Sequence, residues 1–217
     1  MQVIPADAGI KKLDKLNPSD VCMKNRVEKI LDGYRSFRKK FFQDDTLLFE
    51  QLALSQQPNI MVVACCDSRV DPSVLLQANP GDLFVVRTIA SVVPEKNNKA
   101  GISVHAALEF AIKGLCVEHV ILLGHSDCGG AKILFKNDET YEHVHNWMSQ
   151  INIDVQDDDA LERVTKKILM QSHDNCFSFD FIKRAVEQNK LTIHQWYFDI
   201  EKGKLLACSD DGQYHDL

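Results

Sequence analysis

The chain has 217 residues, of which 45% are hydrophobic and 26% charged, with a formal net charge of −6. This length suffices for one domain with its own core and an appendage. The acidic balance and the lack of a basic stripe argue against nucleic acid, and no apolar run reaches membrane-spanning length. Seven cysteines without framework spacing indicate free thiols. Since residues 1–9 show no secretory pattern, we expect a cytoplasmic protein that binds neither nucleic acid nor membrane.

The first fifty residues have the pattern of two helices. Asn17-Pro18 is a typical helix start, and periodic apolar residues continue to Phe41, with a bend expected at Gly33. A second helix is expected over residues 45–55. Because this segment has no strand of its own to cover, we expect it to pack on a partner subunit.

From residue 60 onward, short β-branched runs alternate with helical patterns. Strands are expected at residues 60–64, 83–86, 119–123, 192–200 and 205–208, and helices at 100–113, 158–171 and 178–188, with one more between 136 and 159. This alternation predicts an α/β fold with a mainly parallel central sheet flanked by helices. Residues 1–43 would form an N-terminal helical arm, and residues 44–217 the α/β domain.

Two polar runs follow predicted strands: Cys65-Cys66-Asp67-Ser68-Arg69 and His125-Ser126-Asp127-Cys128-Gly129-Gly130. Parallel sheets bind ligands at the carboxyl ends of their strands, so both runs lie where chemistry is expected. In extended chain Cys65, Asp67 and Arg69 share one side, which leaves Cys66 as a small buried residue.

The second run adds a histidine and a cysteine at metal-ligand spacing. His125 and Cys128 lie three residues apart on a turn that enters a helix, so both can reach one ion. Gly129 and Gly130 allow close backbone approach and expose amide donors at the helix start.

Two cysteines and one histidine leave an open position on zinc, as catalytic sites do. With Asp67 held back by Arg69, this donor set predicts a metal hydrolase or hydratase. A structural zinc site in a binding module would instead need four Cys or His ligands. Thiol chemistry fits less well. A phosphate-binding cysteine loop has five residues between its cysteine and its arginine, whereas here three residues separate Cys65 from Arg69 and two separate Cys66 from Arg69. The remaining cysteines are interpreted as core thiols: Cys22, Cys116, Cys176 and Cys208.

The motifs resemble those of the β-class carbonic anhydrases, and of the plant-type subgroup in particular. The resemblance extends from about Phe37 to the end of the chain and rests on four runs: Cys65 to Val70, Pro80 to Arg87, Gly124 to Gly130 and, more weakly, His194 to Asp199. It implies one zinc per chain, held by Cys65, His125 and Cys128, and a catalytic dyad of Asp67 and Arg69. It also implies a substrate-contacting Gln56, supplied by the neighbouring subunit, and an apolar wall at Phe84; Gly129 and Gly130 complete the expected substrate contacts.

The implied activity is the reversible hydration of carbon dioxide to bicarbonate and a proton by a homodimer or larger assembly. Zinc-bound hydroxide would be the nucleophile, oriented by the Asp67–Arg69 dyad. Two alternatives stay open: a zinc-binding structural or regulatory module without turnover, and a related hydrolase acting on carbonyl sulfide or carbon disulfide.

The chain departs from the family pattern at three positions: Thr88 replaces a common Asn, Phe110 a Tyr, and Gln195 a Gly. Two further positions concern regulation. Some bacterial members have Trp where this chain has Val62 and Gly where it has Ala64, and in them the aspartate leaves its arginine to bind zinc. The resemblance therefore implies the non-allosteric subgroup, with Asp67 paired to Arg69.

Overall fold

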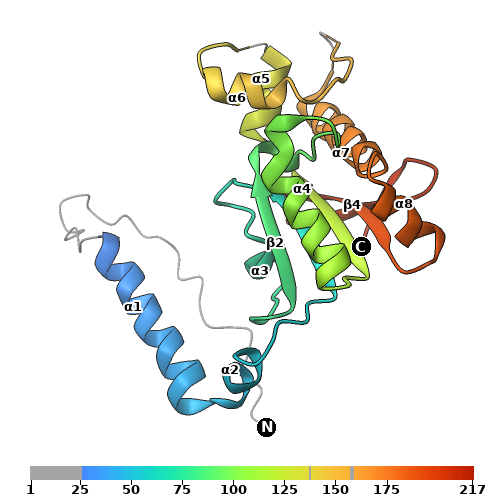
Figure 1. Ribbon diagram of the computed structural model, residues 1–217. Helices are drawn as coiled ribbons and strands as arrows, with labels where there is room; N and C mark the ends of the chain where they lie inside the picture. Colours follow the sequence, from blue (N-terminus) through green and yellow to red (C-terminus); the bar gives the residue numbers. More distant parts are fainter. Residues whose placement is uncertain (1–25, 137, 157–158) are drawn as a thin grey trace, which may run out of the picture. The chain divides into compact units, whose positions relative to one another are not determined.

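The computed structural model describes residues 26–136, 138–156 and 159–217. The chain divides into two compact units between Ser55 and Gln56 (Figure 1), and each is described by itself. The boundary predicted between residues 43 and 44 lies inside the first unit and stays a prediction. The helix start predicted at Asn17-Pro18 lies outside the described residues.

The first unit is helical and carries a cluster of four phenylalanines. It consists of α1 (Arg26–Lys39), a π-helical turn η1 (Lys40–Asp44) and α2 (Leu47–Leu52). The aromatic rings of Phe37, Phe41, Phe42 and Phe49 have centroids 4.8 to 6.1 Å apart. No residue of these three elements is buried, and Ile30 is 72% exposed. An apolar helix face of this kind gains stability only when another surface covers it.

The second unit is built on a six-stranded sheet with the strand order β2-β1-β3-β4-β5-β6. The strands are β1 (Ile60–Cys65), β2 (Leu83–Thr88), β3 (His119–His125), β4 (Thr192–Asp199), β5 (Lys204–Cys208) and β6 (Tyr214–Asp216). Strands β2, β1, β3 and β4 are parallel to one another. Strand β5 pairs antiparallel with both β4 and β6. The mainly parallel sheet is thus confirmed, while β6 was not predicted.

Helices surround this sheet. In chain order they are α3 (Pro72–Leu75), η2 (Ile89–Ser91), η3 (Lys99–Gly101), α4 (Ile102–Glu109), η4 (Phe110–Gly114), α5 (Gly129–Lys136), α6 (Glu142–Met148), α7 (Leu161–Cys176) and α8 (Asp180–Glu187). None of the described helices is long and apolar enough to cross a membrane.

The main core lies between one face of the sheet and α4, α7 and α8 (Figure 1). Leu122 of β3, Leu108 of α4 and Leu169 of α7 are all fully buried in it. Truncating such a leucine to alanine typically costs about 2 to 5 kcal/mol. On the opposite face the buried residues are Val62 and Ala64 with Ile121 and Leu123. The core therefore fixes the central strands β1 and β3, which carry the predicted site at their carboxyl ends.

A buried acid anchors the start of α7. Asp159 accepts hydrogen bonds from Lys167 at 2.6 Å, from Arg163 at 2.9 Å and from the backbone N–H of Gln156 at 3.1 Å. Its side chain is 2% exposed. The Lys167 ammonium, then the Gln156 amide and Arg163, lower the pKa of Asp159 to about 2.

We expect Asp159→Asn to lower the midpoint of thermal unfolding at neutral pH, with the deficit shrinking as the pH falls. The folded-state pKa is depressed, so the charged carboxylate stabilises the fold above the unfolded-state value of about 3.9, and this is lost as pH falls toward about 2. Thermal unfolding scans between pH 7 and pH 3 measure the difference. Glu162→Gln is the matched control, because it removes an exposed carboxylate paired with Lys166 on the same helix. An equal deficit at every pH would contradict the assignment.

Candidate active site and metal centre

The structure brings Cys65, His125 and Cys128 together. Cys65 ends β1, His125 ends the adjacent β3, and Cys128 immediately precedes α5. All three are buried, and their candidate ligand atoms lie within 4.8 Å of one another. The two sulfurs are 4.0 Å apart. Two neighbouring parallel strands and one helix start thus deliver two thiols and one imidazole to a single point, as expected from the sequence.

His125 is oriented as a metal ligand. Its Nδ1 lies 2.8 Å from the backbone carbonyl of Ser126, to which it can donate a proton. This contact leaves Nε2 with its lone pair, and the atom is buried with no hydrogen-bond partner in residues 26–136, 138–156 and 159–217. A hydrogen bond from the second ring nitrogen to a carbonyl is the usual way to fix the tautomer and orientation of a metal-binding histidine. The unpartnered Nε2 and the two sulfurs fit a zinc ion, which prefers this S₂N donor set.

The two thiols share a charge. The Cys128 thiol, followed by His125, lowers the pKa of Cys65 to about 4, against the opposing effect of burial. The Cys65 thiolate in turn raises the pKa of Cys128. Since thiolates, not thiols, bind metals, an arriving cation would displace the proton held between the two sulfurs.

Asp67 and Arg69 form a bidentate ion pair beside these residues. Arg69 donates from Nε to Oδ1 at 2.9 Å and from its NH2 nitrogen to Oδ2 at 2.7 Å, and its backbone N–H also reaches Oδ1. Hydrogen bonding from Arg69 holds the pKa of Asp67 well below its usual range. Asp67 Oδ2 lies 4.0 Å from the unpartnered Nε2 of His125. A permanently charged carboxylate therefore faces the centre of the site without occupying it.

Arg87 supports this turn and was not identified as functional from the sequence. It donates to the carbonyls of Cys65 at 2.9 Å and Asp67 at 2.7 Å, and to Asp71 at 2.9 Å. Asp71 is also the cap of α3, where it accepts the N–H groups of Ser73 and Val74. A charged residue at the end of a predicted buried strand is the signal that could have pointed to Arg87.

Asp127 is the second residue that sequence reasoning missed. Its Oδ2 lies 3.2 Å from the Arg69 guanidinium, its carbonyl accepts from the same arginine at 3.3 Å, and Lys132 pairs with its other carboxylate oxygen. Its backbone adopts φ = 60°, in the left-handed region that Asp tolerates better than most residues. Arg69 is therefore fixed by Asp67 of the first polar run and by Asp127 of the second.

The remaining cysteines differ in part from expectation. Cys66 is not part of the three-residue cluster, as predicted, but it is exposed rather than buried, because the chain leaves the sheet directly after β1. Of the predicted core thiols, Cys176 is buried, Cys208 is partly buried and Cys116 is exposed on a turn with φ = 56°. Cys22 lies outside the described residues.

The two glycines lie at the start of α5. Gly129 is exposed, whereas a Cβ on Gly130 would lie 2.6 Å from Ile89 Cγ2. Gly130 therefore permits the close packing of α5 on η2 beside Cys128. The backbone N–H groups of Ala131 and Gly130 face the Cys128 sulfur.

Gln56 and Phe84 do not join the site of their own chain. Gln56 is exposed and precedes β1, at the end opposite Cys65, a strand length of roughly 17 Å away. Phe84 pairs in register with Met61 near the same opposite end, and its ring centroid lies 5.9 Å from that of the half-exposed Phe110.

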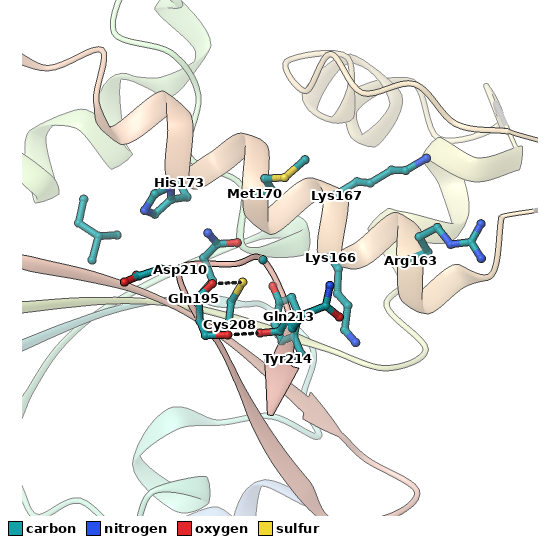
Figure 2. A pocket seen from close by; sticks show the side chains of 13 residues that line it. Arg163, Lys166, Lys167, Met170, His173, Gln195, Cys208, Asp210, Gln213 and Tyr214 are labelled. Atoms are coloured by element: carbon teal, nitrogen blue, oxygen red, sulfur yellow. Dashed lines mark hydrogen bonds between the residues drawn. The ribbon is translucent and has the colours of Figure 1, made fainter. Parts of the chain in front are cut away.

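The positions that depart from the family pattern have defined surroundings. Thr88 pairs in register with Cys65, and its hydroxyl donates to the Val92 carbonyl at 3.2 Å. Val62 and Ala64 are fully buried. Gln195 lines a cavity of about 590 Å³ between α7 and β4 to β6 (Figure 2), which contains none of the three clustered residues.

The basic residues around this cavity are already neutralised, which argues against an anion site there. Arg163 and Lys167 are paired with Asp159, and Lys166 with Glu162. Figure 2 shows His173, Met170, Lys166 and Arg163 along α7 on one side of the cavity, with Gln195, Cys208 and Tyr214 on the other. The candidate chemistry thus lies at the carboxyl ends of β1 and β3.

Comparison with known proteins agrees with this arrangement. The family model described as carbonic anhydrase matches residues 60–205. The chain is 35% identical over 214 residues to beta carbonic anhydrase 3 of Arabidopsis thaliana, an alignment that covers 91% of this chain and 83% of the relative. It is 30% identical over 196 residues to a carbonic anhydrase of Synechococcus elongatus, covering 84% and 72% of the two chains.

Solved structures share the fold. The β-carbonic anhydrase CcaA superimposes with a TM-score of 0.79 at 27% identity, covering 88% of this chain and all of that one. A tetrameric β-carbonic anhydrase of Sordaria macrospora gives a TM-score of 0.74 at 24% identity, covering 85% and 97%. Because the family match spans residues 60–205, it includes both polar runs and the strands that carry them. The chain belongs to the β class of the carbonic anhydrase family, a family of lyases.

Proposed function

We propose that this chain catalyses the reversible hydration of carbon dioxide with one zinc ion held by Cys65, His125 and Cys128. Family membership supports the reaction. The observation that carries the metal assignment is the buried Nε2 of His125, which has no hydrogen-bond partner among the described residues and lies close to two sulfurs. Zinc in such a site lowers the pKa of a coordinated water and so supplies hydroxide near neutral pH.

Asp67 orients the nucleophile. Its carboxylate is fixed by the Arg69 guanidinium and stays ionised, so it can accept a hydrogen bond but cannot donate one. A hydrogen bond accepted at Oδ2 from the hydroxyl of the attacking group would direct that group's lone pair toward carbon dioxide. Arg69 keeps Oδ2 from moving closer to His125. Asp127 joins the second loop to the first through Arg69, and Arg87 braces the first loop.

The substrate contacts are proposed from both subunits. Gly129 and Gly130 border the cluster of ligands within the chain. Gln56 and Phe84 lie at the far end of the sheet from their own cluster, which supports a role for them in the site of a partner. The exposed apolar residues of α1 support an assembly of at least two chains.

A mixed-dimer experiment tests this exchange. We expect Gln56→Ala to lower kcat/KM about tenfold, the effect of losing one hydrogen bond in the transition state. Co-assembly of Gln56→Ala chains with inactive Asp67→Asn chains should then restore activity, because the Asp67-containing site receives Gln56 from its partner. If Gln56 instead acts in its own chain, every site of the mixed dimer is defective, and no recovery is seen.

The function itself is tested by a stopped-flow assay of carbon dioxide hydration on protein of measured zinc content. We expect hydration that scales with zinc up to one ion per chain and disappears when a chelator removes it. Fully zinc-loaded protein without turnover would indicate a binding module instead. Parallel assays with carbonyl sulfide and carbon disulfide identify a related hydrolase if only those substrates react.

A further inference from the structure

We infer that His119 and His194 form a second metal site, separate from the Cys65–His125–Cys128 cluster, for a divalent late transition metal ion. Nε2 of His194 lies 3.2 Å from Nδ1 of His119. The two ring centroids are 5.3 Å apart, with the ring planes inclined by 48°. Two imidazole nitrogens thus face a common point from adjacent strands.

The pair is remote from the proposed catalytic centre. His119 is the first residue of β3 and His125 is the last, so the two are about 20 Å apart along the strand at 3.3 Å per residue. His194 is on β4, in register with Ile121. An ion bound here would therefore lie near the amino-terminal ends of the central strands β3 and β4. It would share no ligand with the Cys65–His125–Cys128 cluster.

The separation of the nitrogens suits bidentate coordination. Histidine nitrogen binds zinc at about 2.0 to 2.1 Å, so two such bonds place the nitrogens about 2.9 Å apart at a right angle and about 3.4 Å apart at a tetrahedral angle. The observed 3.2 Å falls inside this range. Binding therefore needs little more than loss of the proton between the rings.

The surroundings of the two histidines favour the binding of a metal ion. Burial, followed by the proximity of His119, lowers the pKa of His194, which favours the neutral, metal-binding form. His119 also borders a cavity of about 490 Å³ together with Cys116, Glu118 and Lys190. This cavity brings solvent to the His119 side of the pair. Paired imidazoles suit zinc, copper and nickel.

Nickel binding to the purified protein, after its zinc content has been measured, tests the inference. We expect equilibrium dialysis to show one additional Ni²⁺ per chain. His119→Asn and His194→Gln, which remove one ligand nitrogen each, should weaken this binding by at least about tenfold while the zinc content stays unchanged. His143→Gln, on an exposed position of α6, is the matched control and should bind Ni²⁺ like the original chain.

Tryptophan fluorescence locates the ion. The Trp196 ring centroid lies 6.2 Å from that of His194, so Ni²⁺ at the pair should quench its emission. Trp196→Phe should abolish the quenching while Ni²⁺ still binds. Absence of a second ion at millimolar Ni²⁺ would overturn the inference and leave the two rings as a hydrogen-bonded pair. So would histidine variants that both take up as much Ni²⁺ as the original chain.

Discussion

Replacing Cys65 or His125 with alanine is expected to empty the metal site and to lower kcat/KM for carbon dioxide hydration by at least about a thousandfold. Three ligands are the minimum of a catalytic zinc site, so the loss of one leaves the ion weakly bound. The metal supplies the nucleophile, and a contribution of several kcal/mol to the barrier corresponds to this factor. Zinc analysis by mass spectrometry and stopped-flow kinetics on the same samples measure both effects.

Cys66 provides the matched control for this experiment. It is adjacent to Cys65 in sequence but exposed and outside the cluster. Cys66→Ala should therefore retain one zinc per chain and near-normal turnover. Full activity in metal-free Cys65→Ala protein, or equal losses in both cysteine variants, would contradict the ligand assignment.

Asp67→Asn is expected to keep its zinc but to lower kcat by about 10² to 10⁴-fold, the range for removal of a group that handles a proton in the transition state. The amide has nearly the same shape but presents an N–H donor where the carboxylate accepts. It also leaves Arg69 without its bidentate partner. Zinc content and kcat, measured together at pH 8, separate loss of metal from loss of function.

The companion variant Arg69→Gln distinguishes charge from orientation. Without the arginine, the pKa of Asp67 should rise toward its ordinary value of about 3.9, which still leaves the carboxylate ionised at pH 8. Any loss of kcat at that pH then reflects lost orientation. Asp127→Asn should cause a smaller loss, because all contacts between Arg69 and Asp67 remain. A fully active Asp67→Asn protein would contradict the proposed role.

Local sequence patterns were enough to predict the strands and the cluster. The β-branched runs ending at Cys65 and His125 identify two buried parallel strands, and such strands meet at one edge. Alternation along β1 correctly separates Cys65 from Cys66. These features depend on residues near one another in the chain, which periodicity can detect.

Contacts between distant segments were not predictable in the same way. Arg87 reaches carbonyls 22 and 20 residues away, and Asp127 pairs with an arginine 58 residues away, so no local pattern reveals either. The exposure of Cys116 depends on a left-handed turn, and the three-residue β6 is too short for a periodic signal. Cytoplasmic location and the arm boundary at residue 43 stay predictions from the sequence.

Crystallographic data collected at the zinc absorption edge, on crystals grown near neutral pH, test the central claim most directly. We predict one anomalous peak per chain bonded to the sulfurs of Cys65 and Cys128, at about 2.3 Å, and to Nε2 of His125, at about 2.0 to 2.1 Å. Asp67 should remain paired with Arg69. A peak elsewhere, or an Asp67 oxygen within about 2.0 to 2.2 Å of the zinc, would contradict the open three-ligand site.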